Sequence, residues 1–224
     1  TLALAVVAAI HPIVAQRRNV LIYGSAMLLA MIIMILTLDD GVIGRSEGFL
    51  MMLAYVQFIY VLYSNEGGEE VTGEVIADRE PPSRAVPWIV LGLLMVVVGG
   101  NLLVSNGTAI ARDLGVSEYL IGLLSGLGTT APEIVVAGIA ARSGQEGLSV
   151  GALLGSNITD PVFSLGIGAL VADVTVSTGA ISASVTYMLA VSIAVLGLLY
   201  WRRGLDRPAA LVCFLLYVPS LFLY

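Results

Sequence analysis

Apolar segments of membrane-spanning length recur along almost the whole chain. Eight of them lie at residues 2–15, 20–38, 48–63, 86–106, 117–141, 149–171, 180–200 and 208–224. About twenty helical residues cross a hydrocarbon core of about 30 Å, whereas membrane barrels alternate apolar and polar residues over segments of about ten. Hydrophobic residues form 58% of the chain and charged residues 12%, against about 25% charged residues in soluble domains. We therefore expect an all-α polytopic membrane protein with about eight transmembrane helices.

One long polar stretch, residues 64–85, interrupts this pattern. It is rich in glutamate and glycine and ends at a proline pair followed by Arg84. Such a composition predicts a flexible acidic linker between residues 1–63 and residues 86–224. A calcium-sensing role for its acids is the alternative, although the regular spacing of a calcium-binding loop is absent from the sequence.

The ten basic residues are all arginines, and they are distributed unevenly between the predicted loops. If every segment crosses the membrane, one side receives eight of them and the other side only Arg45 and Arg112. Positive residues favour the cytoplasmic side. We therefore expect the linker to be cytoplasmic and the C-terminus to face outside, in what we expect to be a prokaryotic plasma membrane.

Few other functional classes fit the composition. The formal net charge is -6, and no basic patch in the sequence predicts a nucleic-acid partner. One cysteine and one histidine provide no ligand set for zinc or copper. The arrangement of residues that an intramembrane protease needs is also absent from the sequence, so we do not expect an enzyme.

Two carboxylates, Glu133 and Asp160, lie within long apolar segments. An ionised side chain at this depth costs several kcal/mol, so it usually has a functional reason. Carboxylate oxygens suit hard cations, and Ca²⁺ takes about six to eight oxygen ligands. Two carboxylates could hold one divalent ion, or be neutralised instead by monovalent ions or protons. Such mutual exclusion is a physical basis for antiport.

Each carboxylate has a hydroxyl and a proline near it. Thr129 precedes Glu133 by four residues, and Ser156 precedes Asp160 by four, so each pair shares a helix face. A proline beside each carboxylate removes a backbone donor, which predicts a bend and freed carbonyl oxygens. Taken singly, a threonine pair or a proline kink is ordinary helix structure. The predicted helix-breaking residues are Gly128, Pro132, Asn157 and Pro161.

At these residues the chain resembles the cation/Ca²⁺ exchanger superfamily, and its prokaryotic Na⁺/Ca²⁺ exchangers in particular. Gly-Thr-Thr-Ala-Pro-Glu at 128–133 and Gly-Ser-Asn-Ile-Thr-Asp at 155–160 are similar to the second alpha-repeat of that family, here residues 117–171. The resemblance implies ten helices in two inverted halves, with four central helices forming the ion site. Carried over by position, the implied ion ligands are Glu133, Asp160, Thr129, Thr130, Ser156 and the Gly126 carbonyl.

The resemblance implies a secondary antiporter that exchanges Ca²⁺ for Na⁺ by alternating access, without a cofactor. A Ca²⁺/H⁺ antiporter of the same fold and a truncated, non-transporting membrane subunit remain alternatives, and a role for K⁺ stays open. Residues 1–63 would hold the end of helix three with helices four and five, and residues 86–224 helices six to ten. We therefore expect the first alpha-repeat to precede Thr1. A faint echo of residues 1–63 in 165–224 agrees with an inverted repeat.

Overall fold

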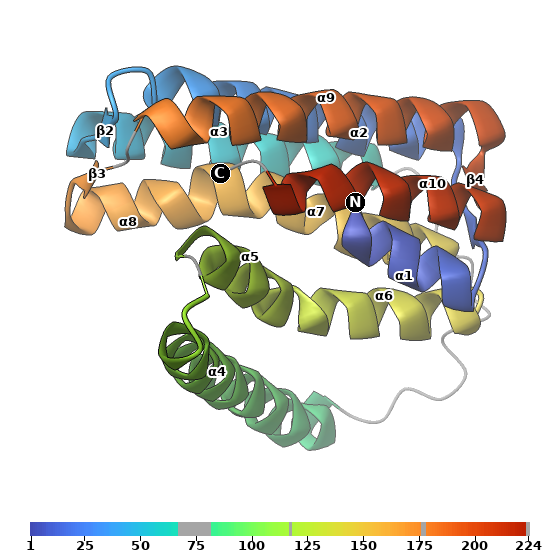
Figure 1. The fold of residues 1–224 in the computed structure, drawn as a ribbon. Coiled ribbons are helices and arrows are strands. Elements are labelled where there is room, and N and C mark those ends of the chain that lie inside the picture. Colours follow the sequence, from blue (N-terminus) through green and yellow to red (C-terminus); the bar gives the residue numbers. More distant parts are fainter. Residues whose placement is uncertain (67–81, 117, 176–177, 223–224) are drawn as a thin grey trace. The chain divides into compact units, whose positions relative to one another are not determined.

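The computed structural model describes residues 1–66, 82–116, 118–175 and 178–222. It is mostly helical and divides into two compact units (Figure 1). Unit 1 contains residues 1–62 and 133–224, and unit 2 contains residues 63–132. Most of the predicted acidic linker, residues 67–81, lies outside the described residues.

Helices of unit 1 come from both ends of the chain. They are α1 (Leu2–Ile10), α2 (Arg17–Thr37), α3 (Arg45–Glu66), α6 (Ala131–Arg142), α7 (Glu146–Thr159), a π-helix (Asp160–Ser164), α8 (Leu165–Val171), α9 (Thr178–Arg202), α10 (Arg207–Tyr217) and a 3₁₀ turn (Val218–Phe222). Unit 2 is formed by α4 (Pro82–Asp113) and α5 (Glu118–Thr129), with short extensions of α3 and α6.

Each of the eight predicted apolar segments contains helix in the described part of the chain, although residues 11–15 of the first segment lie beyond α1. Three stretches there are long and apolar enough to cross a membrane: Arg17–Thr37, Arg45–Ser64 and Ala183–Arg202. A shorter apolar stretch covers Arg207–Ser220. The predominantly helical fold is therefore confirmed, whereas the count of eight spans stays a prediction.

Several boundaries differ from those that hydropathy predicts. The apolar segment 117–141 forms two helices, α5 and α6, which meet at Thr130. Helix α3 continues to Glu66 and α4 begins at Pro82, so the helices extend into the stretch 64–85. Hydropathy marks the part of a helix that suits hydrocarbon, whereas the helix itself continues until its backbone hydrogen bonds end. A proline at the first helical position, as in α4, is favourable because its missing N–H is not needed there.

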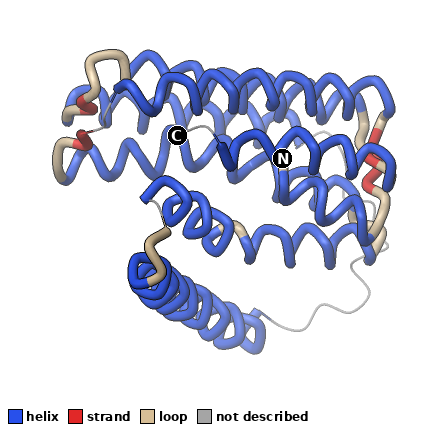
Figure 2. Tube along the Cα trace, viewed as in Figure 1, coloured by secondary structure: helices blue, strands red, loops and turns tan. Residues whose placement is uncertain are grey.

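Four two-residue strands, which an all-α prediction did not include, connect the helices of unit 1. The first, β1 (Ile13–Val14), pairs antiparallel with β4 (Gly204–Leu205), and β2 (Val42–Ile43) pairs antiparallel with β3 (Val174–Thr175). Figure 2 shows the two strand pairs at opposite ends of the unit. Each pair satisfies backbone donors and acceptors where a helix ends.

The order of elements in the first part of unit 1 repeats in its last part. The order α1–β1–α2–β2–α3 is matched by α8–β3–α9–β4–α10. Strands β1 and β3 begin 161 positions apart, at residues 13 and 174, and β2 and β4 begin 162 apart, at residues 42 and 204. Each strand pairs with a strand of the other copy, since β1 pairs with β4 and β2 pairs with β3.

Unit 1 is held together by packing of α1 and α2 on helices from the later part of the chain. Helix α2 packs on α7, on the π-helix and on α9, and α1 packs on α10. The buried core includes Met31 of α2, Leu154 of α7 and Leu199 of α9. Because these contacts join residues far apart in sequence, the compact units differ from the two halves that the linker predicts.

Candidate functional site

Glu133 lies in the first turn of α6, directly after Pro132. Pro132 is the second residue of this helix, where its missing N–H leaves no intrahelical bond unmade. The Glu133 side chain is half-buried, and its Oε2 is buried without a hydrogen-bond partner among the described residues. A buried carboxylate oxygen without a donor is costly. A cation or a proton would remove that cost.

Asp160 is the first residue of the π-helix that joins α7 to α8. Its side chain is exposed, and its charge interacts electrostatically with that of Glu133. Both residues belong to unit 1. Two carboxylates close enough to repel each other favour the binding of a positive charge between them. The role of these two carboxylates as ion ligands stays a prediction.

The π-helix fixes the backbone at Asp160. The N–H of Leu165 donates to the Asp160 carbonyl, five residues back, and Pro161 cannot donate. Val162 is fully buried, and the ring of Phe163 packs on Tyr55 of α3 with centroids 4.7 Å apart. Single π turns inside α-helices frequently occur at functional sites.

Two polar side chains near the end of α7, Asn157 and Thr159, bond to carbonyls of their own helix. Asn157 Nδ2 donates to the Leu153 carbonyl at 2.7 Å, which leaves the Asn157 side-chain oxygen as an acceptor. The N–H of Asp160 donates to the Ser156 carbonyl, so these two residues are one helical turn apart as predicted. The Ser156 side chain is half-buried. Its predicted role as an ion ligand stays a prediction.

Thr129, the last residue of α5, and Thr130, which follows it, both bond back to α5. Their hydroxyls donate to the Gly126 carbonyl at 3.0 and 2.8 Å, and the Thr130 N–H donates to it at 3.1 Å. The hydroxyl oxygens retain lone pairs for a cation, whereas the Gly126 carbonyl already accepts three bonds. These three residues belong to unit 2, so their predicted place in the ion site stays a prediction.

The contact between Phe163 and Tyr55 could not be found from the sequence. Aromatic residues in an apolar segment are equally consistent with a lipid-facing surface, and no spacing rule joins residues so far apart in the chain.

Within the described residues, no group of three or more His, Cys, Asp or Glu side chains could hold a metal ion.

Comparison with known proteins identifies the family. The family model described as sodium/calcium exchanger protein matches residues 84–224. The chain belongs to this family. The matched region contains Glu133, Asp160 and the helix breaks beside them, which confirms the resemblance seen in the two sequence motifs.

Relatives of this exchanger-family chain include membrane proteins of bacteria and archaea. The inner membrane protein YrbG of Escherichia coli is 31% identical over 189 residues, which cover 80% of this chain and 58% of YrbG. The sodium/calcium exchanger MaX1 of Methanosarcina acetivorans is 37% identical over 83 residues, covering 37% of this chain and 24% of MaX1. The chain thus spans little more than half the length of YrbG.

A solved structure of the sodium-calcium exchanger NCX_Mj has the same fold. The likeness covers 98% of this chain and 70% of that one, with a TM-score of 0.69 and 22% sequence identity. At this identity the comparison establishes the fold alone. Together with the membrane-protein relatives, it confirms that this exchanger-family chain is an integral membrane protein.

Proposed function

We propose that this chain is part of a secondary antiporter that exchanges Ca²⁺ for Na⁺ across a membrane. The observation that carries the proposal is the carboxylate pair of unit 1. Glu133 has a buried oxygen without a donor in the part of the chain that the structure describes, and its charge repels that of Asp160. One Ca²⁺ ion neutralises both charges, whereas Na⁺ ions neutralise them singly, so the two ions compete for the same oxygens.

Neutral oxygens would add further ligands. The side chain of Ser156 would join the two carboxylates of unit 1, whereas the hydroxyls of Thr129 and Thr130 are proposed as ligands from their spacing in the sequence alone. Since both threonine hydroxyls donate to Gly126, their lone pairs are available to a cation. The Gly126 carbonyl would become a ligand only when a cation displaces some of its three donors.

We further propose that the repeated element order reflects two inverted halves. The nearly equal offsets of 161 and 162 residues between corresponding strands support this, as does the pairing of each strand with one from the other copy. Residues 1–63 would then belong to the first half and residues 86–224 to the second, with the first alpha-repeat supplied by residues outside this sequence. Alternating access would move the halves around the ion site.

The arginine distribution supports one orientation for this arrangement. Segments with many arginines favour the cytoplasmic side, which places the linker at 64–85 in the cytoplasm and the C-terminus outside. A cysteine introduced at Ser220, near the C-terminus, would react with a membrane-impermeant maleimide from outside intact cells. Reaction only after the cells are opened would contradict this orientation.

Flux measurements on the full-length protein in liposomes test the function. An outward Na⁺ gradient should drive uptake of radiolabelled Ca²⁺, and dissipating that gradient with a sodium ionophore should stop it. A pH gradient without Na⁺ should drive no uptake. Uptake driven by the pH gradient alone would instead establish Ca²⁺/H⁺ exchange, and no coupled uptake under either gradient would leave the non-transporting alternative.

A further inference from the structure

One end of unit 1 gathers arginines from three segments of the chain. Strand β1 leads into Arg17, and the pairing of β1 with β4 brings this residue to the end of α9 and the start of α10. Arg17 Nε donates to the Tyr200 carbonyl at 3.3 Å, and its guanidinium lies 5.1 Å from the centre of the Tyr200 ring. We call the set Arg17, Arg202, Arg203 and Arg207 the arginine end; all four side chains are exposed.

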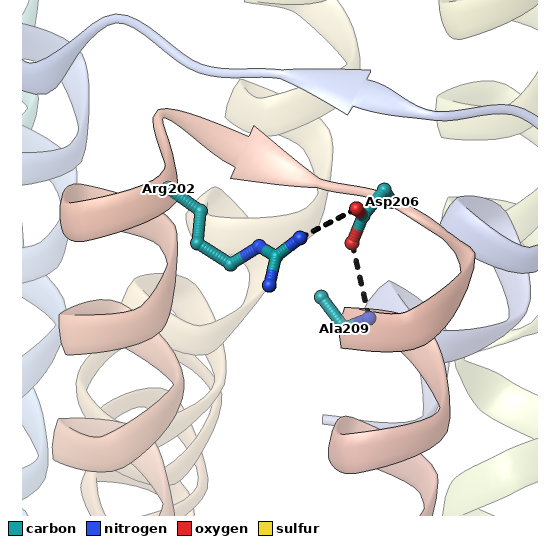
Figure 3. A network of polar contacts seen from close by, with 3 residues as sticks. All are labelled: Arg202, Asp206 and Ala209. Atoms are coloured by element: carbon teal, nitrogen blue, oxygen red, sulfur yellow. Dashed lines mark hydrogen bonds and ion pairs between the residues drawn. The ribbon is translucent and has the colours of Figure 1, made fainter.

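Among the described residues, one arginine of the arginine end, Arg202, forms an ion pair with a carboxylate. Arg202 Nη2 lies 2.6 Å from Asp206 Oδ2, and Asp206 Oδ1 accepts the Ala209 N–H at 3.1 Å, as Figure 3 shows. Asp206 thus caps α10 and pairs with one arginine of the four. The other end of unit 1, around β2 and β3, has the opposite balance. It carries Arg45 together with Asp39, Asp40, Glu47 and Asp173.

Arg203 has an unfavourable backbone conformation. Its φ is 57°, which makes it the only residue other than glycine with a positive φ among those described. Helices commonly end in this conformation, but glycine adopts it at lower cost than a residue with a Cβ. The Arg203 carbonyl accepts the Ala15 N–H at 3.0 Å, a bond that glycine would make equally well. The backbone therefore gives no reason for arginine here, which indicates that the guanidinium has a use.

Exposed apolar and aromatic side chains lie beside the arginine end. Trp201, next to Arg202, is 79% exposed, and Ile10 and Val14, on either side of the turn into β1, are about half exposed. Tryptophan is enriched where hydrocarbon meets the lipid headgroups. A soluble anion needs only the charges, whereas this combination of guanidinium groups and apolar surface suits a lipid.

We propose that the arginine end binds the phosphate groups of anionic phospholipids, with Arg203 and Arg207 as principal contacts. Arginine presents a planar fork of donors that matches a phosphate, and basic groups near a membrane surface attract anionic lipid. The acyl chains would lie along the exposed apolar residues. This site is separate from the carboxylate pair, so it stands or falls independently of the proposed transport.

Trp201 provides the probe for a direct test. A full-length variant whose only tryptophan is Trp201 is reconstituted in mixtures of phosphatidylglycerol and phosphatidylcholine, with bromine on the chains of one lipid at a time. Bromine quenches a tryptophan that it contacts, so the two experiments together report which lipid lies against Trp201. We expect phosphatidylglycerol to be enriched several-fold over its bulk fraction, and high salt to reduce the enrichment.

Three variants separate the site from a general effect of charge. Arg203→Gly relieves the strained backbone and preserves the fold, yet should reduce the enrichment by about fivefold, as should Arg207→Gln. Arg45→Gln removes one positive charge at the other end of unit 1 and should leave the enrichment of phosphatidylglycerol unchanged. Equal quenching by the two lipids in the parent protein would overturn the proposal. So would unchanged enrichment in Arg203→Gly and Arg207→Gln, or an equal loss in Arg45→Gln.

Discussion

Gly48 of α3 and Gly166 of α8 lie directly against each other. A Cβ built on Gly48 would be 2.8 Å from the Gly166 carbonyl oxygen and 2.9 Å from Ala169 Cβ. Since most of this surface is backbone, it cannot yield to an added methyl group. The contact joins the early part of the chain to α8, directly after the π-helix that carries Asp160.

Gly48→Ala should therefore destabilise unit 1. Overpacking of this kind costs about 1–3 kcal/mol, and thermal unfolding in detergent should show a lower Tm. Gly168→Ala is the matched control on α8, because a Cβ there would have its nearest neighbour, Val174, at 3.8 Å. A Gly48→Ala protein as stable as Gly168→Ala would show that the two helices do not pack this closely.

Asp206 should make the stability of the protein depend on pH in the acid range. The N–H of Ala209 and the nearby Arg202 guanidinium hold the pKa of Asp206 below its ordinary value of 3.8. A lowered pKa means that the unfolded chain binds the proton more readily than the folded one. The stabilisation by this carboxylate is therefore complete above about pH 3.8 and is lost as the pH falls through the lower folded-state pKa.

Two substitutions at Asp206 separate the charge from the cap. Asp206→Asn keeps an N-cap side chain and loses only the charge, whereas Asp206→Ala loses both. Near neutral pH, the Tm should be highest for the parent protein, lower for Asp206→Asn and lowest for Asp206→Ala. The difference between the parent and Asp206→Asn should vanish in acid, and a difference that persists there would refute the assignment.

Replacing Thr130 by valine should weaken Na⁺ binding. Valine keeps the shape of the side chain but removes the hydroxyl that donates to Gly126 and would contact the ion. A hydrogen bond or similar polar contact to a charged group is worth about 1.5–3 kcal/mol, so the Na⁺ concentration for half-maximal exchange should rise about tenfold or more. Thr130→Ser should remain close to the parent protein. Equal behaviour of the valine and serine variants would exclude the hydroxyl as a ligand.

The carboxylate pair should act as a single unit towards Ca²⁺. Glu133→Gln and Asp160→Asn should each weaken Ca²⁺ binding at least tenfold, equivalent to about 1.4 kcal/mol. The double variant should be much less impaired than the sum of the two effects, because either change alone already breaks the site. Calorimetric titration of the three purified variants checks this. Additive losses would mean that the two residues act at separate sites.

The sequence predicts the helices of this protein well because membrane spans need long apolar segments. It also places breaks near Thr130 and Asp160, where glycine, proline and hydroxyl residues gather. The π form at Asp160–Ser164 is not predictable in this way, since it depends on packing such as that of Phe163 on Tyr55. The two-residue strands escape prediction as well, because each pairs with a segment more than 130 residues away.

The internal repeat is clearer in the structure than in the sequence. The positions that correspond to Gly48 and Gly166 are Ala210 and Ala5, at offsets of 162 and 161, and both alanines are buried where α1 packs on α10. Small residues are kept at both interfaces although the residue types differ. Sequence comparison detects only a faint echo, because close packing of helices constrains side-chain size more than identity.

Of the predicted ligands, the carboxylates stand out most in the sequence, because a charge in an apolar segment is unusual. The neutral ligands were harder to assign. The carbonyl of Gly126, a predicted ion ligand, accepts bonds from Thr129 and Thr130. Back-bonding of this kind is the usual behaviour of helical threonines, and spacing alone does not tell it apart from ion binding.

The most direct test of the proposed function is the effect of Glu133→Gln on Ca²⁺ uptake driven by a Na⁺ gradient. Glutamine preserves the size of the side chain and removes its negative charge. One oxygen of the Glu133 carboxylate is buried without a donor among the described residues. We predict that uptake by the full-length variant in liposomes falls to the level of protein-free liposomes, while Glu146→Gln, at the start of α7, retains normal uptake. Uptake by Glu133→Gln at the parent rate would contradict the proposal that this carboxylate binds the transported ion.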